Sequence, residues 1–302
     1  MLSKYHRIHA GVSFYCLSPF FCAVGINSLI FFVGLFSASA WGYSYRVIVQ
    51  EGGEYSAAQA SPGDDLQYPA PIVWKTNPLS FSLDLNSAAA PDNASTGNEE
   101  DWNAIARTPI NKWVAEEEKL SWVEQGQSSI ICNNLDALDN VNLVTWSADS
   151  CAGEWDDEIL ALTQINYQFS GSGGELDAEI IEAHILINNT LRWGAYDGAL
   201  KYDALGRAIF DIKRVLLHEY GHALGLTHPD ENGQQVAAIM NSLESDRYLL
   251  ANDDVAGVRA LYSSEGSTGS AIVSENKSST KGGAITLGML FLLVALFFYR
   301  NK

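Results

Sequence analysis

The stretch from His218 to Asp230 constrains this chain more than any other part of its sequence. His218 and His222 are four residues apart, so at about 3.6 residues per helical turn they share one helix face. Two imidazoles in that arrangement can bind one metal ion without distorting the backbone. Glu219 follows His218 directly and suits the general base beside a metal-bound water. The spacing predicts a catalytic metal site on a helix.

Catalytic zinc typically takes three protein ligands and leaves its fourth position to water. Gly225 allows the helix to end in a left-handed conformation, and the chain can then turn back to bring His228 to the metal. The alternative is a structural helix with incidental histidines, but five such fixed residues should coincide in on the order of one in 100,000 unrelated chains. Of six histidines in the chain, three fall in this motif. We therefore predict that His218, His222 and His228 bind one zinc ion.

This motif, together with Ala238-Ile239-Met240-Asn241 shortly after it, resembles the metzincin metalloproteases. Their signature is H-E-x-x-H-x-x-G-x-x-H followed by a methionine turn. The resemblance implies that Met240 underlies the zinc site as a hydrophobic base. A methionine that fills a gap in the core is the simpler interpretation, and it is compatible with the same role.

Within that clan, the chain is most similar to the matrixins and their bacterial relatives. The similarity is strongest in Leu217 to Leu226 and in Asn252 to Tyr262, which corresponds to the family's C-terminal helix, and it covers roughly residues 70 to 263. It implies an α+β, zincin-like fold with a twisted mixed sheet, an active-site helix and a Met-turn. Asn241-Ser242 departs from the Tyr-Pro that often follows the matrixin methionine, in a stretch that shapes the pocket for the side chain after the scissile bond.

Composition and charge limit the classes of partner that the chain can bind. The chain has 302 residues, 47% of them hydrophobic and 18% charged, enough for one sizeable core with flanking segments. Its formal net charge of −18 argues against nucleic acid as a partner. Asp156-Asp157-Glu158 and Glu99-Glu100-Asp101 are candidate Ca²⁺ ligands, as calcium binds many matrixins, but neither forms a regular calcium loop. A solvated acidic surface is the interpretation that we favour.

Residues 1–40 are typical of an export signal. Lys4 and Arg7 supply a positive start, residues 29–36 an apolar centre, and Ala38-Ser39-Ala40 a small-x-small cleavage pattern. We predict cleavage after residue 40, and an uncleaved membrane anchor is the alternative.

The cysteines agree with export. Cleavage would remove Cys16 and Cys22 and leave Cys132 and Cys151, an even pair that favours a disulfide in an oxidising compartment. Two buried thiols are the alternative. Residues 41–70 are interpreted as an N-terminal arm or a short pro-segment. This segment contains no cysteine, so the cysteine latency device of many matrixins is expected to be missing.

Residues 71–263 are predicted to form the catalytic domain. Apolar alternation predicts strands at 72–74, 79–85, 142–146, 162–169 and 180–188. Apolar residues from Trp102 to Trp122 recur at helical spacing, although Pro109 should break or kink that helix. Asp211 is expected to cap the active-site helix.

Residues 180–188 resemble the matrixin edge strand along which an extended substrate pairs, main chain to main chain. The resemblance makes Ala183, His184, Ile185 and Leu186 the predicted substrate strand. For His184, contact with substrate or metal is one interpretation and a structural role is the more common one.

The C-terminal composition changes abruptly. Residues 264–281 are predicted to be a flexible linker, and residues 284–299 form an unbroken apolar run. With Gly282-Gly283 and a basic end, residues 282–302 resemble the bacterial GlyGly sorting signal processed by rhombosortase, a rhomboid-type protease. A retained transmembrane anchor is the alternative, and a GPI signal fits less well with the basic end.

The sequence therefore predicts an exported zinc endopeptidase, secreted or at the cell surface, that cleaves protein or peptide substrates. The alternative is a surface adhesion or binding module that retains zinc without proteolysis. Glu219 favours the enzyme, because a binding module has no need of that carboxylate. Asp253 or Asp254 is expected to pair with the new N-terminal ammonium, as in matrixins, and capping of their helix is the simpler alternative.

Overall fold

The computed structural model describes residues 5–10, 42–51, 53–87, 89–91, 101–126, 138–151, 153–156 and 159–263. It has an α+β fold, which confirms the predicted class. Its strands are β1 (Tyr5–Ala10), β2 (Ser44–Glu51), β3 (Glu54–Ala60), β4 (Ala70–Trp74), β5 (Leu79–Asp84), β6 (Trp122–Gln125), β7 (Leu143–Ser147), β8 (Ala161–Ser170), β9 (Asp177–Asn188), β10 (Trp193–Gly194), β11 (Lys201–Tyr202), β12 (Ala208–Asp211) and β13 (Leu226–Thr227). The helices are α1 (Trp102–Val114), α2 (Ile212–Ala223) and α3 (Asn252–Tyr262), with a short 3₁₀ turn at Gly173–Glu175.

The main sheet is mixed, as predicted. Its principal order is β13-β2-β4-β9-β7-β5-β6, with β3 added to β2 and β8 added to β9. β4, β5, β6, β7 and β9 pair with one another in parallel, whereas β8 runs antiparallel to β9. β1 pairs antiparallel along the other side of β8.

The prediction that residues 183–186 form the substrate-pairing edge is wrong. In β9, His184 stands opposite Leu143 of β7 on one side and opposite Gln164 of β8 on the other. Ala183, Ile185 and Leu186 lie in the same doubly paired strand, so a substrate backbone cannot add there. The nearly continuous apolar run of β9 belongs to a strand buried on both faces, with β8 beside it and β1 beyond β8.

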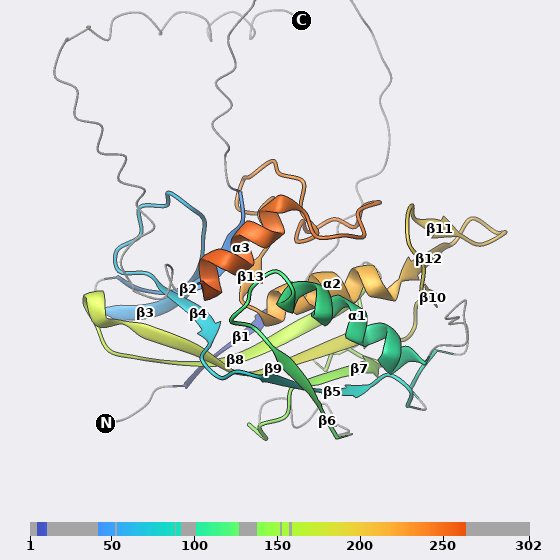
Figure 1. Cartoon of the computed structure of the whole chain (residues 1–302), viewed down its shortest axis with the longest axis horizontal. Helices are drawn as coiled ribbons and strands as arrows, with labels where there is room; N and C mark the ends of the chain where they lie inside the picture. The colour runs from blue at the N-terminus through green and yellow to red at the C-terminus, as the bar shows by residue number, and fades with distance from the viewer. Residues whose placement is uncertain are drawn as a thin grey trace, which may run out of the picture. The chain divides into compact units, whose positions relative to one another are not determined.

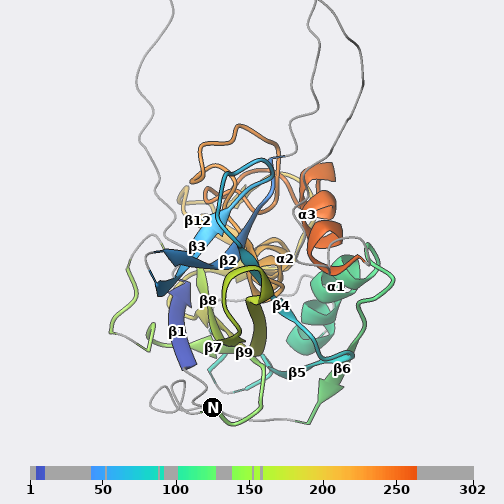
Figure 2. The same cartoon turned by 90° about the vertical axis from the view of Figure 1, so that its left-hand side faces the viewer.

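Helices α1 and α2 lie on the same face of the main sheet (Figures 1 and 2). The indole Nε1 of Trp113 at the end of α1 donates to Leu217 O on α2 at 2.7 Å, inside the core. Pro109 lies within α1 without ending it. The helix ends at Val114 and does not reach Trp122 as predicted, and Trp122 instead begins β6.

The segment before the predicted catalytic domain joins the same sheet. β2 and β3 form a hairpin, and β2 also pairs with β13, which immediately precedes His228. The Thr227 hydroxyl donates to Ser44 Oγ at 2.8 Å, and both residues are buried. The hairpin therefore supports the loop that carries the third histidine.

The predicted linker and the tail at 282–302 lie outside the described residues, as do most of residues 1–40 and Cys132. The pairing of Cys132 with Cys151 stays a prediction. Across the described part of the chain, no helix has the length and apolarity to cross a bilayer.

Candidate metal centre

The helix that carries two of the histidines is fixed at both ends. At its start, the Asp211 carboxylate accepts hydrogen bonds from Lys213 N and Arg214 N at 3.3 and 3.2 Å, which confirms the predicted N-cap. At its end, Gly225 has a φ of 98°, in the left-handed region. A Cβ at Gly225 would lie 2.6 Å from Ile72 O, so only glycine fits this turn.

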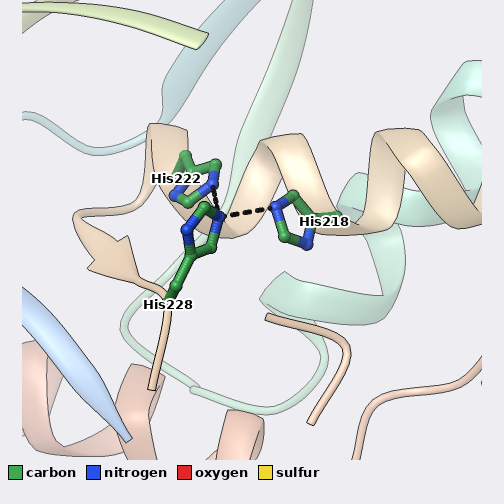
Figure 3. A group of neighbouring side chains, drawn as sticks. All are labelled: His218, His222 and His228. Atoms are coloured by element: carbon green, nitrogen blue, oxygen red, sulfur yellow. Dashed lines mark hydrogen bonds between the residues drawn. The ribbon is translucent and has the colours of Figure 1, made fainter. Parts of the chain in front are cut away.

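The turn brings His228 against the two helical histidines. Its Nε2 atom lies 3.2 Å from Nε2 of His218 and 3.0 Å from Nε2 of His222 (Figure 3). All three rings are almost completely buried. Among the described residues, these histidines are the only group of three or more His, Cys, Asp or Glu side chains able to share a metal ion.

The other nitrogen of each ring fixes its tautomer. Every Nδ1 atom faces an oxygen that only accepts hydrogen bonds: Ile239 O at 2.8 Å for His218, Leu226 O at 2.9 Å for His222, and Glu231 Oε2 at 2.9 Å for His228. Each Nδ1 therefore carries the proton, and each Nε2 directs a lone pair toward the others. Three converging lone pairs are stable together only around a cation.

The donor set fits zinc. Zinc–nitrogen bonds of about 2.0–2.1 Å in a tetrahedron place two ligand nitrogens roughly 3.3–3.4 Å apart, close to the separations seen here. Burial lowers the pKa of His218 to about 3, with a further contribution from His228, and lowers that of His228 to about 4. The imidazoles are therefore neutral near pH 7, as metal ligation requires.

Glu219 is completely buried beside these ligands. Its Oε2 accepts a hydrogen bond from the hydroxyl of Thr163 at 2.6 Å, whereas its Oε1 has no hydrogen-bond partner among the described residues. Burial raises the pKa of Glu219 to about 8, and the Thr163 hydrogen bond opposes that rise. A cation at the three Nε2 atoms would favour the ionised form. Glu219 thus has one oxygen held and one available.

Met240 packs directly against the metal-binding helix. A Cβ at Gly221 would lie only 2.2 Å from Met240 Sδ, so this glycine is what allows the close approach. The Asp254 carboxylate accepts hydrogen bonds from Ile239 N at 2.9 Å and Met240 N at 3.2 Å, which fixes the turn. The sequence singled out Met240, but it gave no indication that Asp254 holds the turn.

A second carboxylate, that of Asp230, connects the loop that carries His228 to the segment after Met240. Asp230 accepts hydrogen bonds from Ser242 N at 2.9 Å and from Ser242 Oγ at 2.6 Å. Ser242 is one of the two residues at which the chain departs from the matrixin pattern. The departure therefore supplies a hydrogen bond that the proline of that pattern could not donate.

A small hollow, partly open to solvent, lies beside His218. Its lining includes Arg214 and Glu244, which are largely buried and whose Nη1 and Oε1 atoms are 3.7 Å apart. Arg214 also donates from Nη2 to Gly198 O at 2.5 Å. Burial raises the pKa of Glu244 to about 7, with Arg214 opposing the rise. The hollow thus combines apolar walls with a buried arginine and a largely buried glutamate.

His184 belongs to a different cluster. Its Nε2 lies 2.8 Å from Glu182 Oε1, and Glu182 also accepts hydrogen bonds from Asp139 N, Asn140 N and Asn166 Nδ2. These partners support the structural interpretation of His184. The predicted acidic clusters are only partly described, and Asp101 caps α1 by accepting from Ala104 N at 2.5 Å.

Two residues at the site were missed by the sequence reasoning, Thr163 and Glu231, and Asp254 was singled out for a different role. Glu231 carried a local signal, because it follows His228 by three residues. Thr163 carried none, since 56 residues separate it from Glu219.

The family model for Matrixin matches residues 98–263, more than half of the chain. Human matrix metalloproteinase-16 is 38% identical over 52 residues, covering 17% of this chain and 9% of that protein. Matrix metalloproteinase-27 from Tupaia belangeri is 36% identical over 53 residues, covering 18% and 10%. Human neutrophil collagenase is 34% identical over 55 residues, covering 18% and 12%. The matches span about a tenth of these relatives' own length.

Proposed function

Because the chain belongs to the matrixin family of metalloproteases, we propose that it is an exported, zinc-dependent endopeptidase that hydrolyses peptide bonds of proteins. The observation that carries the proposal is the convergence of three buried Nε2 lone pairs beside a buried glutamate with one unpartnered oxygen. A site built only for binding would have no use for that carboxylate.

The residues divide the chemistry between them. His218, His222 and His228 hold the ion, which when bound would polarise the scissile carbonyl and acidify a water molecule. Glu219 accepts the proton of that water at Oε1 and passes it to the departing amine. The histidines stay neutral, because the Nδ1 proton of each is held in a hydrogen bond that leaves Nε2 to bind the ion.

Strand β8 is the proposed docking strand for an extended substrate. Its inner side pairs with β9, and its outer side accepts an antiparallel strand, since β1 pairs there from Tyr5 to Ala10. Residues 5–10 lie in the predicted export signal, so cleavage after residue 40 would leave this side open. Substrate main chain would then add to the sheet, with alternate side chains facing the site.

The hollow beside His218 is the proposed pocket for the side chain after the scissile bond. Its apolar walls suit an aliphatic side chain, and the buried Arg214–Glu244 pair lines part of it. We expect small or medium apolar residues to be preferred at that substrate position.

The mature N-terminus is proposed to begin just after Ala40. Gly42 N already donates to Asp253 Oδ1 at 2.8 Å, and Oδ2 of Asp253 is buried without a hydrogen-bond partner. An ammonium group at this end of the chain would find that carboxylate within reach. The hairpin of β2 and β3 would then remain as an arm of the mature enzyme.

Several finer proposals rest on the sequence alone. They are a bacterial type of matrixin, a GlyGly tail at residues 282–302 cut by a rhombosortase-type enzyme or retained as an anchor, and a Cys132–Cys151 disulfide. Calcium binding by the acidic surface is a further proposal. Export and secretion agree with the extracellular setting that is typical of matrixins.

Hydrolysis of an unstructured protein such as casein tests the function. We expect the purified chain to cleave casein, a chelator to stop cleavage, and zinc to restore it. Glu219→Ala should retain zinc and lose activity by at least about a hundredfold, the size of a general-base contribution. Full zinc without cleavage by either protein would contradict the endopeptidase and favour the zinc-retaining adhesion or binding module.

A further inference from the structure

Thr163 connects the strand proposed to dock substrate with the proposed general base. It is completely buried on β8, and its hydroxyl lies 2.6 Å from Glu219 Oε2 and 3.2 Å from Glu219 O. A hydroxyl has one proton to donate, and the shorter contact to the carboxylate is the stronger of the two. Thr163 therefore donates chiefly to the Glu219 side chain.

Nothing else that the structure describes holds this carboxylate by a hydrogen bond. Oε1 is buried and has no partner, and Oε2 has only Thr163. The terminal torsion of a glutamate has a broad energy minimum, so packing alone leaves the carboxylate plane poorly fixed. The Thr163 hydroxyl removes that freedom and leaves Oε1 for the water.

The main chain of Thr163, unlike its side chain, takes part in the pairing of the sheet. It lies in the ladder opposite Ile185 of β9, in the strand whose outer side is proposed to pair with substrate. One residue thus links the position of the substrate backbone to the position of the base. Reacting atoms held at fixed separations lower the barrier, and a misplacement of about 1 Å can cost on the order of a hundredfold in rate.

We propose that Thr163 is a positioning residue that aligns the Glu219 carboxylate with the substrate held along β8. The proposal rests on the endopeptidase function. Thr163→Val keeps the shape of the side chain and removes the donor, whereas Thr163→Ser keeps the donor. We expect the valine variant to lose about tenfold in kcat with little change in KM, and the serine variant to recover most of the loss.

The test measures kcat, KM and zinc content for the wild-type chain, both Thr163 variants and a matched control. Thr145→Val is that control, because the Thr145 hydroxyl is also buried in a strand but bonds only to the backbone oxygens of Asp84 and Trp146. An equal kcat in the valine variant and the wild type, or an equal loss in the valine and serine variants, would overturn the positioning role. An inactive wild-type chain with full zinc would instead overturn the endopeptidase function, and this proposal with it.

A double-mutant cycle supplies a measurement that does not depend on catalysis. Thr163→Val should lower the urea midpoint in the presence of Glu219 and change it much less in a Glu219→Ala background, because only in the first background does it break the hydrogen bond to the carboxylate, the stronger of the two contacts. Equal shifts in the two backgrounds would overturn the contact on which the positioning role depends.

Discussion

Two buried glutamates stand on adjacent elements, each near a histidine, and they differ in how their oxygens are used. Glu182 on β9 accepts four hydrogen bonds, from His184, Asn166 and the backbone of Asp139 and Asn140. Glu219 accepts one side-chain hydrogen bond, from Thr163, and leaves Oε1 without a partner. Both glutamates are almost completely excluded from solvent.

The two glutamates are both buried, but their pKa values shift in opposite directions. At Glu182, burial works to raise the pKa, but hydrogen bonds from His184 and the backbone outweigh it and hold the pKa below its usual value. At Glu219, burial prevails and raises the pKa to about 8. The hydrogen bonds that Glu182 accepts stabilise the fold, whereas the unpartnered Oε1 of Glu219 agrees with the proposed role of Glu219 as the general base.

The largest effect on stability should come from the satisfied glutamate. Glu182→Ala removes the acceptor of four hydrogen bonds, two of them from the buried side chains of Asn166 and His184, so we expect the free energy of unfolding in urea to fall by about 3 kcal/mol or more. Zinc content and kcat of the folded fraction should stay near the wild-type values.

Glu219→Gln is the matched change at the other glutamate. It keeps the shape of the side chain and removes the charge of a carboxylate that accepts only one side-chain hydrogen bond. It should therefore lower the free energy of unfolding by about 1 kcal/mol or less, while peptide hydrolysis is almost entirely lost. A stability loss at Glu219 as large as that at Glu182 would break the comparison.

Glu244 is a third buried carboxylate, and its pKa can be compared with those of Glu182 and Glu219. Its folded-state pKa is raised by burial to about 7 from 4.5, so between these values the unfolded chain ionises while the folded chain keeps its proton. Stability contributed by Glu244 is therefore lost as the pH rises through this window, by up to about 3 kcal/mol at about 1.36 kcal/mol per pKa unit.

Urea unfolding of the wild type and Glu244→Gln at pH 5 and pH 8 measures that loss. The glutamine variant has nothing to ionise, so its stability relative to the wild type should increase from pH 5 to pH 8. Glu54→Gln, at an exposed position, is the control and should show no such increase. A constant difference between Glu244→Gln and the wild type would contradict the raised pKa.

Glu231 should produce the smallest effect, because its side chain is 44% exposed. The Glu231 side chain accepts the hydrogen bond from Nδ1 of His228 and so orients that ring, whereas backbone carbonyls orient the rings of His218 and His222. Loss of a carboxylate that orients a zinc-binding histidine typically costs at least about tenfold in affinity. We expect Glu231→Gln to weaken zinc binding by about tenfold in a chelator competition, and an unchanged affinity would show that loop packing suffices.

The local half of the site was predictable from the sequence. The spacing of His218, His222 and His228, with Gly225 between them, is set by helix geometry and one left-handed turn. Strands and helices with clear periodicity were also found at nearly their observed bounds, and the C-terminal helix at Asn252–Tyr262 matches the expected stretch.

What failed depended on contacts distant in sequence. Apolar alternation in residues 180–188 shows that a strand is buried but not which strands flank it, so an edge position was assigned to a strand that is paired on both sides. Trp122 continued a helical spacing by coincidence, although α1 ends at Val114. Thr163 meets Glu219 only because β8 packs beneath α2, which no local pattern encodes.

Zinc content is the most direct test of the central claim, that converging unprotonated nitrogens and not buried histidines in general mark the metal site. The matched variants are His228→Gln and His184→Gln, measured by elemental analysis after dialysis against a fixed low concentration of zinc. We predict one zinc per chain in the wild type and in His184→Gln, and a marked loss in His228→Gln. Equal zinc in both variants, or none in the wild type, would contradict the account.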